Sequence, residues 1–335
     1  MKKTFLLASL MSLGLGAMAQ SAEADSKDIM GSLQDIGFGK AIERLDASLK
    51  QYPDNYELQQ DKVLVNYYNR NFSNVISLGK PLLERSDAQD MVFQLVGSAY
   101  SSIVQYKDAI KVLSKGINKF PNSALLYAEL GSAYLGDLDQ KEAIKVFEKG
   151  IQVDPNISGN YYELAKLYAT NNNPLWSVLY GEMFVDLESL TPRTKEIKIL
   201  LFNQYKALFA SSTVIGKYIS SGKPFEKAVA TTLEKYTNIL SDGVTTESLI
   251  ALRGQFIVDW FQSDNYKTYP FRLFDRERQL LKQGNFEAYN QWLFSSSNEA
   301  AYNNWASLHQ DDLNAFNTFH RSVIFKPLKG EYYSH

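Results

Sequence analysis

The sequence repeats itself at an interval of 34 residues over much of its first half. Shifting residues 125–156 by 34 positions lays this segment over its neighbours without a gap. Small residues form two columns at this spacing, which are Ala41, Val75, Ala109, Ala143 and Ser177, and then Gly97, Gly131 and Ala165. Aromatic residues form two more, which are Phe93, Tyr127 and Tyr161, and then Tyr100, Tyr134 and Tyr168. A chain with such a period builds one supersecondary unit several times.

Each unit is expected to consist of two helices. Its apolar residues recur three or four apart, which is helical spacing, as in Tyr127, Leu130 and Tyr134 and then Ala143, Ile144, Phe147 and Ile151. Gly131 and Ala143 remove side-chain bulk where the two backbones approach. Pro155 ends the second helix, because proline lacks the amide that a helix interior needs. One pair cannot bury its apolar faces alone, so the units must stack into a continuous core.

These columns resemble the tetratricopeptide repeat (TPR) family, whose 34-residue pattern has an aromatic residue, Leu-Gly, Tyr, Ala, a large apolar residue and Pro at the corresponding positions. The match is strongest over residues 90–157, good over 158–191 and weaker over 22–89, where Gln59, Asn66 and Gly79 replace apolar residues. The resemblance implies an all-α fold, with a right-handed superhelix (an α-solenoid) of about five repeats over residues 22–191. It also implies a concave face that binds peptides or helices of partner proteins.

The N-terminus is typical of a secretory signal peptide. Lys2 and Lys3 precede an apolar run, and Ala17 and Ala19 form a small-residue motif before Gln20. The run is shorter than the roughly 20 residues of a membrane-spanning helix, and no cysteine follows it to carry a lipid. We therefore expect a signal peptide at residues 1–19 and an exported protein, periplasmic or secreted, without a lipid anchor.

Composition limits the kinds of partner that the chain is expected to bind. The formal net charge of −2 over 335 residues favours neither nucleic acid nor an anionic membrane as a partner. The chain has no cysteine, so disulfides cannot brace it even in an oxidising compartment. Residues 20–35 are polar and weakly periodic, which leaves open a flexible leader or a degenerate first helix.

After residue 191 the period is lost, and an irregular helical domain is expected over residues 192–335. Thr191 and Pro192 resemble the start of a helix that would run to about Ala210 and cover the end of the repeats. Ser296 with Glu299 predicts a capping box for another helix. Further helical patterning covers residues 225–240, 246–262, 271–283, 285–294, 299–309 and 312–322. The stretch that begins at residue 284 resembles the opening of a second repeat helix, but its alanine falls one residue early, so we interpret it as a divergent pair.

No catalytic constellation is recognisable, so no catalytic residue, metal ligand or cofactor is expected. The three histidines, His309, His320 and His335, lack the close Cys, His or carboxylate neighbours of a metal site. His309 and His320 fall near predicted helix C-termini, where the helix dipole favours a partly positive ring. Gly216 and Gly222 have the wrong spacing for a phosphate-binding loop and are interpreted as part of a turn before a helix. No G-x-S-x-G motif is present.

The C-terminal region is rich in aromatic residues, including Trp260, Phe261, Trp292 and Trp305. Their helical spacing favours a core, and an exposed aromatic shelf for a glycan is the alternative. Trp260 and the adjacent Phe261 cannot both face one core, which keeps the alternative open. Carboxylates that would suit carbohydrate binding or hydrolysis lie in the same region: Asp259, Asp264, Asp275 and Glu277.

The better candidate for binding is the concave face that the TPR resemblance implies. Its residues, carried over by position, are Gln60, Leu64, Tyr67, Gln94, Ser98, Ser101, Ala128, Ser132, Leu135, Tyr162, Lys166 and Ala169. They are small and mostly uncharged. Lys62 and Asn66 have the spacing of a carboxylate clamp but fall in packing columns. A neutral helix or an extended segment therefore suits this face better than an acidic tail.

Two functions are compatible with these sequence features. The first is a non-catalytic scaffold or adaptor in the cell envelope that docks a protein segment in the concave face. The second is carbohydrate or cell-wall binding, or hydrolysis, by the C-terminal domain. Burial of the tryptophans would distinguish between them.

Overall fold

The computed structural model describes residues 21–220, 223–331 and 333, and every regular element within these ranges is a helix. The expected signal peptide, Gly222 and His335 lie outside the described residues. The chain divides into two compact units, Met1–Ala143 and Ile144–His335. Helix α8 (Gln140–Val153) crosses this boundary, and each unit is described by itself. No helix of the described part is long and apolar enough to span a membrane.

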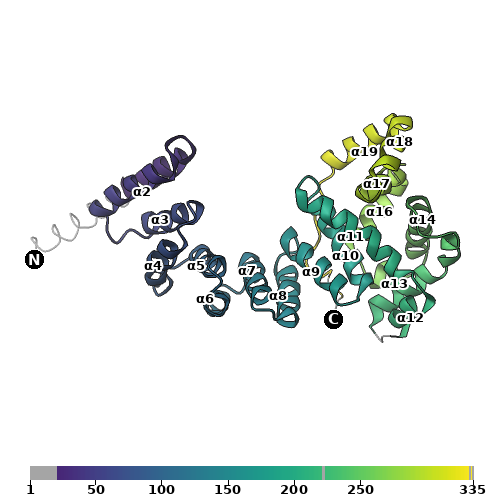
Figure 1. The fold of residues 1–335 in the computed structure, drawn as a ribbon, viewed down its shortest axis with the longest axis horizontal. Coiled ribbons are helices and arrows are strands. Elements are labelled where there is room, and N and C mark those ends of the chain that lie inside the picture. The colour runs from purple at the N-terminus through teal and green to yellow at the C-terminus, as the bar shows by residue number, and fades with distance from the viewer. Residues whose placement is uncertain (1–20, 221–222, 332, 334–335) are drawn as a thin grey trace, which may run out of the picture. The chain divides into compact units, whose positions relative to one another are not determined.

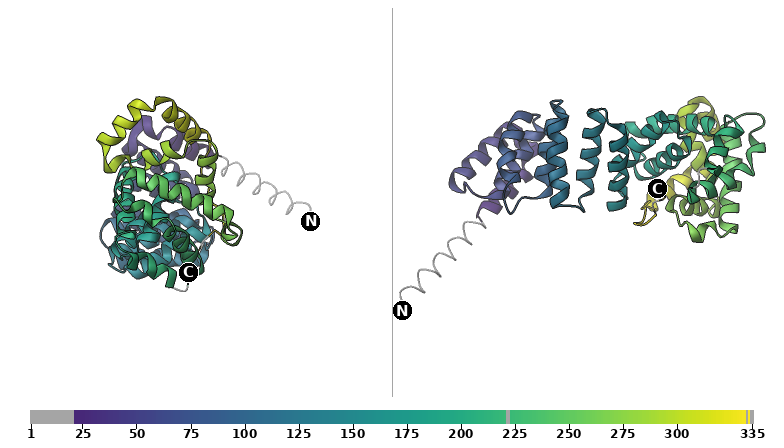
Figure 2. Two further views of the ribbon diagram at one scale, coloured as in Figure 1. Left: turned by 90° about the vertical axis from the view of Figure 1, so that its right-hand side faces the viewer. Right: turned by 90° about the horizontal axis from the view of Figure 1, so that it is seen from below.

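The first unit is a row of paired helices (Figures 1 and 2). Residues 21–31 are helical. The helices that follow are α2 (Leu33–Gln51), α3 (Tyr56–Tyr68), α4 (Phe72–Leu83), α5 (Asp90–Ser102), α6 (Tyr106–Lys119) and α7 (Ala124–Gly136). Each packs against the next, and in addition α3 packs against α5 and α5 against α7. The first helices of successive pairs therefore lie side by side, as the 34-residue period predicts.

The turns inside the pairs also keep the period. Four residues adopt positive φ at intervals of 34: Arg70, Val104, Leu138 and Asn172, with φ of 60°, 63°, 66° and 53°. At each turn the next amide donates to a carbonyl five residues earlier, as from Gln105 to Tyr100 at 2.9 Å. This is the Schellman ending of a helix. The same turn recurs at Gly284, where Asn285 N donates to the carbonyl of Leu280, so the pair interpreted as divergent retains the turn of a repeat.

The small-residue columns act as contacts between helices. A Cβ built on Gly97 would lie 2.4 Å from Cγ of Leu113 in the neighbouring α6. Gly79 is one of the positions where the sequence departs from the repeat pattern. A Cβ added there would lie 2.3 Å from Cγ2 of Val96, so the valine fills the space that the missing side chain leaves. Asn66, at another such position, is buried and donates to the carbonyl of Lys62.

The segment that the sequence left open is helical rather than a flexible leader. Ala22 and Ile29 are buried in a cluster with Ala41, Leu45 and Leu58. Ser26 Oγ donates to Asp61 Oδ2 of α3 at 2.5 Å. These contacts cover the end of the first unit with an apolar helix face.

The second unit contains the remaining helices. They are α9 (Ser158–Thr170), α10 (Pro174–Leu187), α11 (Pro192–Leu208), α12 (Ser212–Ser220), α13 (Pro224–Glu234), α14 (Thr246–Gln262), α15 (Asn265–Thr268), α16 (Arg272–Lys282), α17 (Phe286–Phe294), α18 (Glu299–Leu308) and α19 (Gln310–Ser322), with 3₁₀ turns at Thr237–Leu240 and Ser295–Ser297. The predicted start of α11 is confirmed, because Thr191 and Thr194 form a reciprocal cap ahead of Pro192.

Two local predictions for this unit are wrong. Gly216 lies inside α12 and not in a turn, because Ile215 and Tyr218 give this short segment a buried apolar face. Ser296 does not cap α18. Asn298 does, since its side-chain oxygen accepts from the amide of Ala301 at 3.1 Å.

Candidate protein-binding face

The first unit gathers seven of the predicted binding residues on its first helices. We call this surface the inner face, defined by Gln60 and Tyr67 of α3, Gln94, Ser98 and Ser101 of α5, and Ala128 and Ser132 of α7. All are half-buried except Ser98, which is buried, and Ser132, which is exposed. Because α5 contacts both α3 and α7, these residues lie on one surface of this unit.

A polar cluster lies at the middle of the inner face. Ser98 Oγ donates to Glu129 Oε2 of α7 at 2.6 Å. Burial raises the pKa of the Tyr67 hydroxyl, and the negative charge of Glu129 raises it further, whereas a hydrogen bond with Ser98 lowers it. Tyr67 is therefore neutral at physiological pH and can donate or accept a hydrogen bond.

Other polar groups on this face are incompletely paired. Gln60 Nε2 lies 3.6 Å from the sulfur of Met91. Gln60 Oε1 and Ser101 Oγ are buried atoms for which the described part of the chain supplies no hydrogen-bond partner. Unpaired buried polar atoms are destabilising. After rotation of the Gln60 side chain, a docked segment with backbone or side-chain donors would satisfy the glutamine oxygen.

Sequence reasoning overlooked Glu129. It occupies the column after Ala128, together with Asp61, Leu95 and Glu163 at the same 34-residue spacing. This column was not among those assigned to the concave face. The available signal was that three of the four residues in this column are acidic.

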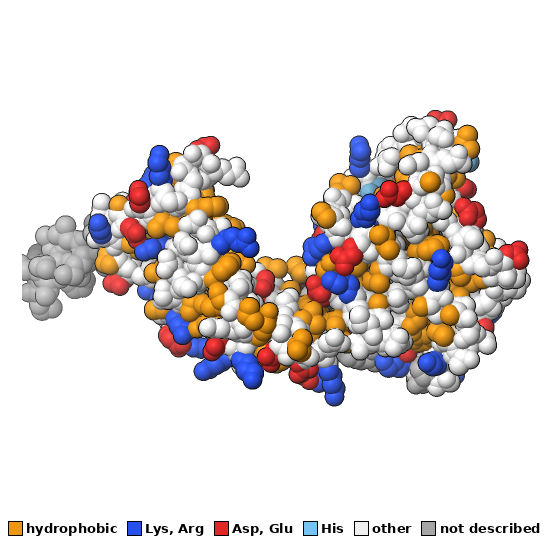
Figure 3. Space-filling model, viewed as in Figure 1, with side chains coloured by type: hydrophobic (Ala, Val, Ile, Leu, Met, Phe, Trp, Pro, Cys, Tyr) orange, Lys and Arg blue, Asp and Glu red, His pale blue; other side chains and the backbone are white. Residues whose placement is uncertain are grey.

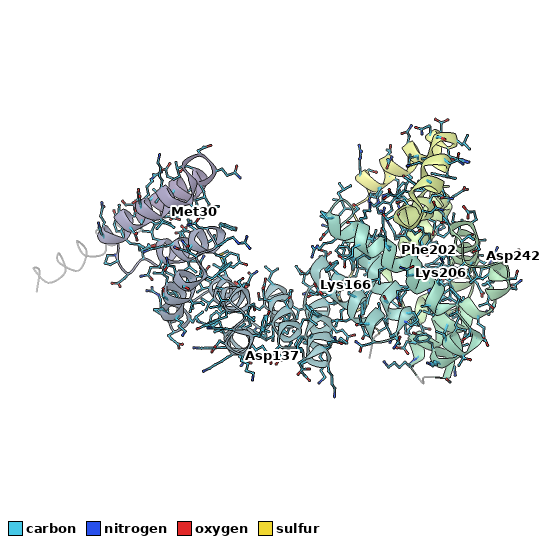
Figure 4. The ribbon with its side chains drawn as sticks, viewed as in Figure 1. Met30, Asp137, Lys166, Phe202, Lys206 and Asp242 are labelled. Carbon is cyan, nitrogen blue, oxygen red and sulfur yellow. The ribbon has the colours of Figure 1, made fainter. Side chains whose placement is uncertain are left out.

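Of the other predicted residues, Leu64 and Leu135 lie on α3 and α7, and Tyr162, Lys166 and Ala169 lie in the second unit on α9 (Figure 4 labels Lys166). The Lys166 ammonium lies 4.4 Å from the centroid of the Tyr162 ring. Tyr162 donates to Glu196 Oε2 of α11 at 2.6 Å, and Lys166 Nζ lies 3.7 Å from Glu196 Oε1. Both side chains are therefore engaged with acceptors of their own unit, which the sequence did not indicate.

Lys62 and Asn66 do not form a carboxylate clamp. Lys62 pairs with Asp46 of α2 at 2.5 Å, and Asn66 is buried. Both side chains are therefore used in packing between helices, in agreement with the columns that they occupy.

The aromatic residues of the second unit form its core. Trp260 is fully buried, and its ring centroid lies 5.0 Å from that of Phe274. Trp292 and Trp305 are half-buried. Trp305 stacks on His309, and Trp292 contacts His320 with the two rings tilted by 52°. Phe261 is half-buried beneath the guanidinium of Arg278, which resolves how Trp260 and Phe261 share one helix. The rings give no support to an exposed aromatic shelf.

The acidic residues considered for carbohydrate chemistry do not converge. Asp259 pairs with Lys235, Asp264 with Lys267, and Glu277 lies inside the core against Arg253. Asp275 is half-buried, and burial raises its pKa. Each of the three ion pairs has its own basic partner, so these carboxylates do not share one site.

Glu277 belongs to a buried charge cluster, which we define as Glu182, Tyr205, Arg253 and Glu277. Arg253 Nη2 donates to Glu182 Oε2 at 2.6 Å and to Glu277 Oε1 at 2.7 Å, and Tyr205 donates to Glu182 Oε1 at 2.6 Å. Burial raises the pKa of Glu277 well above its ordinary value, and the charge of Arg253 opposes that effect. The adjoining cavity has a volume of about 30 Å³, which suits a water molecule and not a substrate.

His309 and His320 contact neighbouring side chains of the second unit. No group of three His, Asp or Glu side chains suited to a metal occurs in the described residues. His309 Nδ1 lies 3.1 Å from Asp312. The expectation of a partly positive ring is wrong for His320, because burial, Arg276 and Lys198 lower its pKa to about 4. It is neutral at physiological pH.

Solved structures share the helical-repeat arrangement at low sequence identity. No protein-family model and no curated protein matches the sequence. The structure described as pilF of Pseudomonas aeruginosa aligns with a TM-score of 0.51 and 15% identity, covering 63% of this chain and 97% of that one. A tetratricopeptide repeat protein of Parabacteroides merdae aligns at 0.45 and 14%, covering 83% and 98%. MamA of Desulfovibrio magneticus aligns at 0.43 and 19%, covering 50% and 94%.

Only the first of these alignments is close enough to support a statement about fold, and it says nothing about ligand or partner. It covers 63% of this chain. The chain thus has the fold of a tetratricopeptide-repeat protein, an all-α solenoid.

Proposed function

We propose that this protein is a non-catalytic scaffold or adaptor of the cell envelope that docks a segment of another protein on the inner face. The observation that carries the proposal is that α3, α5 and α7 present half-buried polar residues on one continuous surface. Gln60 Oε1 and Ser101 Oγ on that surface are buried without a partner in the described chain. Rotation of these side chains would bring their polar atoms within reach of the donors and acceptors of a docked backbone.

The proposal includes export without a lipid anchor. Its support is the sequence of residues 1–19, with two lysines, an apolar run and a small-residue motif. Mass spectrometry of the protein recovered from the periplasmic fraction should give a chain that begins at Gln20. A mass that retains residues 1–19 would contradict the export step.

Affinity capture tests the inner face directly. The mature protein should recover a partner from an envelope extract, and the double substitution Gln94→Arg with Ser132→Arg should abolish the recovery, because it places two bulky charges on α5 and α7. Asn118→Arg with Asn122→Arg is the matched control, since both residues are exposed in the same unit and lie outside the inner face. Equal recovery by the two variants would exclude the inner face as the binding site.

A further inference from the structure

Two adjoining hollows lie along α4, on the side of the first unit that the second helix of each pair forms. The larger, about 620 Å³, is lined by Lys80, Lys111 and Lys115 among others, and the smaller, about 310 Å³, by Lys62. Ser77 and Pro81 line both hollows. We call the combined recess the α4 groove. Neither Ser77 nor Pro81 belongs to the inner face.

Lysines outnumber carboxylates in the otherwise mostly apolar lining of the α4 groove. Lys62 is paired with Asp46 at 2.5 Å, and Lys80, Lys111 and Lys115 face two lining carboxylates, those of Glu84 and Asp108. Lys115 Nζ pairs with Glu84 at 2.6 Å, and this pair is exposed, with 48% and 72% of the two side chains accessible. An exposed pair of this kind is weak and exchanges readily for another acid.

Helix α6 extends the positive charge beyond the groove. Lys107, Lys111, Lys115 and Lys119 recur every four residues and are all exposed. Side chains four apart on a helix are neighbours, and like charges at this spacing repel. Figure 3 shows Lys and Arg side chains projecting from the lower edge of this unit, where α6 lies. An anionic partner would relieve this repulsion.

Charge differs between α4 and α6 and the first helices of the pairs, whereas α2 carries three acidic and three basic residues. The second helices α4 and α6 carry five lysines and one aspartate. The first helices α3, α5 and α7 carry four acids, Glu57, Asp61, Asp90 and Glu129, and one lysine, which is paired with Asp46. An acidic segment is therefore attracted to the α4 groove and repelled from the inner face.

We propose that the α4 groove is a second binding surface, and that its occupant is an acidic protein segment that also carries apolar residues. The lysines supply the charge complementarity. The recess also contains Pro81, Leu83 and Val112, which offer apolar contact to a side chain that enters it. A flat bilayer surface would meet the lysines without filling the recess, so shape favours a protein segment.

Fluorescence anisotropy of the mature protein with synthetic peptides tests the proposal. The probe is a fluorescein-labelled peptide of glutamate, leucine and serine, and its counterpart has glutamine in place of glutamate. The acidic peptide is expected to bind at least about tenfold more tightly at low salt, and added salt should reduce the difference. Lys80→Glu with Lys111→Glu should remove this preference.

Lys27→Glu with Lys40→Glu is the matched control, because it changes net charge equally and both residues are exposed outside the α4 groove. This control should retain binding, and so should Gln94→Arg with Ser132→Arg, which separates this proposal from the inner face. Because the chain has no cysteine, Ser77→Cys provides a unique attachment point for a photocrosslinker, which should capture the acidic peptide.

Three results would overturn the proposal. Equal affinity for the two peptides would remove the charge argument. Equal weakening by the control pair would show that net charge alone decides binding. Binding of vesicles of phosphatidylglycerol and phosphatidylcholine, with no binding of the acidic peptide, would make a lipid surface the occupant.

Discussion

Gly97 shows how a single residue sets the distance between two helices. The backbone of α5 approaches Leu113 so closely that no side chain fits between them, and both residues are buried. A methyl group here must displace a fully buried leucine, and overpacking of a core typically costs about 1–3 kcal/mol.

Gly97→Ala should therefore lower the free energy of unfolding by about 1–3 kcal/mol, measured by urea denaturation. Gly159→Ala is the matched control, since a Cβ at Gly159 in α9 meets nothing within 4 Å. The control should leave stability unchanged or raise it by up to about 1 kcal/mol, because alanine favours helix over glycine. A loss of equal size in both variants would contradict the role of Gly97 as a contact.

Lys198 is a buried amine in the second unit. Only 6% of its surface is accessible, and its ammonium lies 3.6 Å from the centroid of the Trp292 ring. Burial lowers its pKa from 10.5 to about 7. Between these values the unfolded chain binds a proton that the folded chain does not, so stability rises with pH in this window.

Replacing Lys198 with methionine should remove this pH-dependent contribution to the free energy of unfolding. The stability of the wild type relative to Lys198→Met should increase between about pH 7.5 and 9.5, by at most about 1.4 kcal/mol per pH unit. Urea denaturation at both pH values measures the difference. Parallel pH profiles of the two proteins would show that Lys198 titrates normally.

At the scale of elements, Arg253 connects α14 to two other helices. It is 2% exposed and bonds Glu182 of α10 and Glu277 of α16, while Tyr205 of α11 bonds the same Glu182. Removing one member of a buried ion cluster leaves charges without compensation, which typically costs about 3–5 kcal/mol.

Arg253→Met should therefore destabilise the second unit by about 3–5 kcal/mol in thermal or urea denaturation. Adding Glu277→Gln to this variant should recover part of the loss, because one uncompensated carboxylate disappears. Arg278→Met on α16 is the control, since Arg278 is only half-buried over Phe261, and it should cost about 1 kcal/mol or less. No recovery in the double variant would indicate that Arg253 acts by packing alone.

The repeats were predictable from sequence because their contacts recur at a fixed spacing. Gly97, Ala109 and Tyr100 each occupy a column that predicts a neighbour in the next helix. Glu182, Arg253 and Glu277 have no such column, since their partners lie 71 and 24 residues apart. The start of α18 was misplaced because Asn298 and Ser296 are both good caps, and only packing decides between them.

The inner face was predictable from the sequence to a smaller extent than the repeats. Gln60, Gln94 and Ala128 share a column, so their common surface follows from the register. The hydrogen bond between Ser98 and Glu129 joins two columns and required coordinates. The α4 groove was not predicted, because it depends on a space between helices rather than on a pattern of residues.

At the scale of the whole molecule, the boundary between the repeats and the C-terminal helices depends on which helices share one hydrophobic core. The sequence predicts it at residue 192, but α10 is buried along most of its length within the second unit. Trp176 Nε1 donates to Glu226 Oε1 at 2.6 Å, and Tyr218 donates to Asn173 Oδ1 at 3.0 Å. These bonds favour a folding unit that includes α10.

A fragment of residues 192–335 should lack a cooperative thermal transition, because it loses Glu182 and Trp176. A fragment of residues 144–335 should show one by circular dichroism. Both fragments contain the same C-terminal helices, so the longer fragment is the control. A cooperative transition in the shorter fragment would place the boundary at residue 192.

The turns at Val104 and Leu138 have the same backbone conformation. In each, the amide of the next residue donates to the carbonyl five residues earlier. Joining Val104 directly to Asp139 would re-create that joint with one period removed. The part of the chain that carries the inner face is therefore modular. Duplication or loss of a single repeat would lengthen or shorten the inner face without requiring a new type of turn.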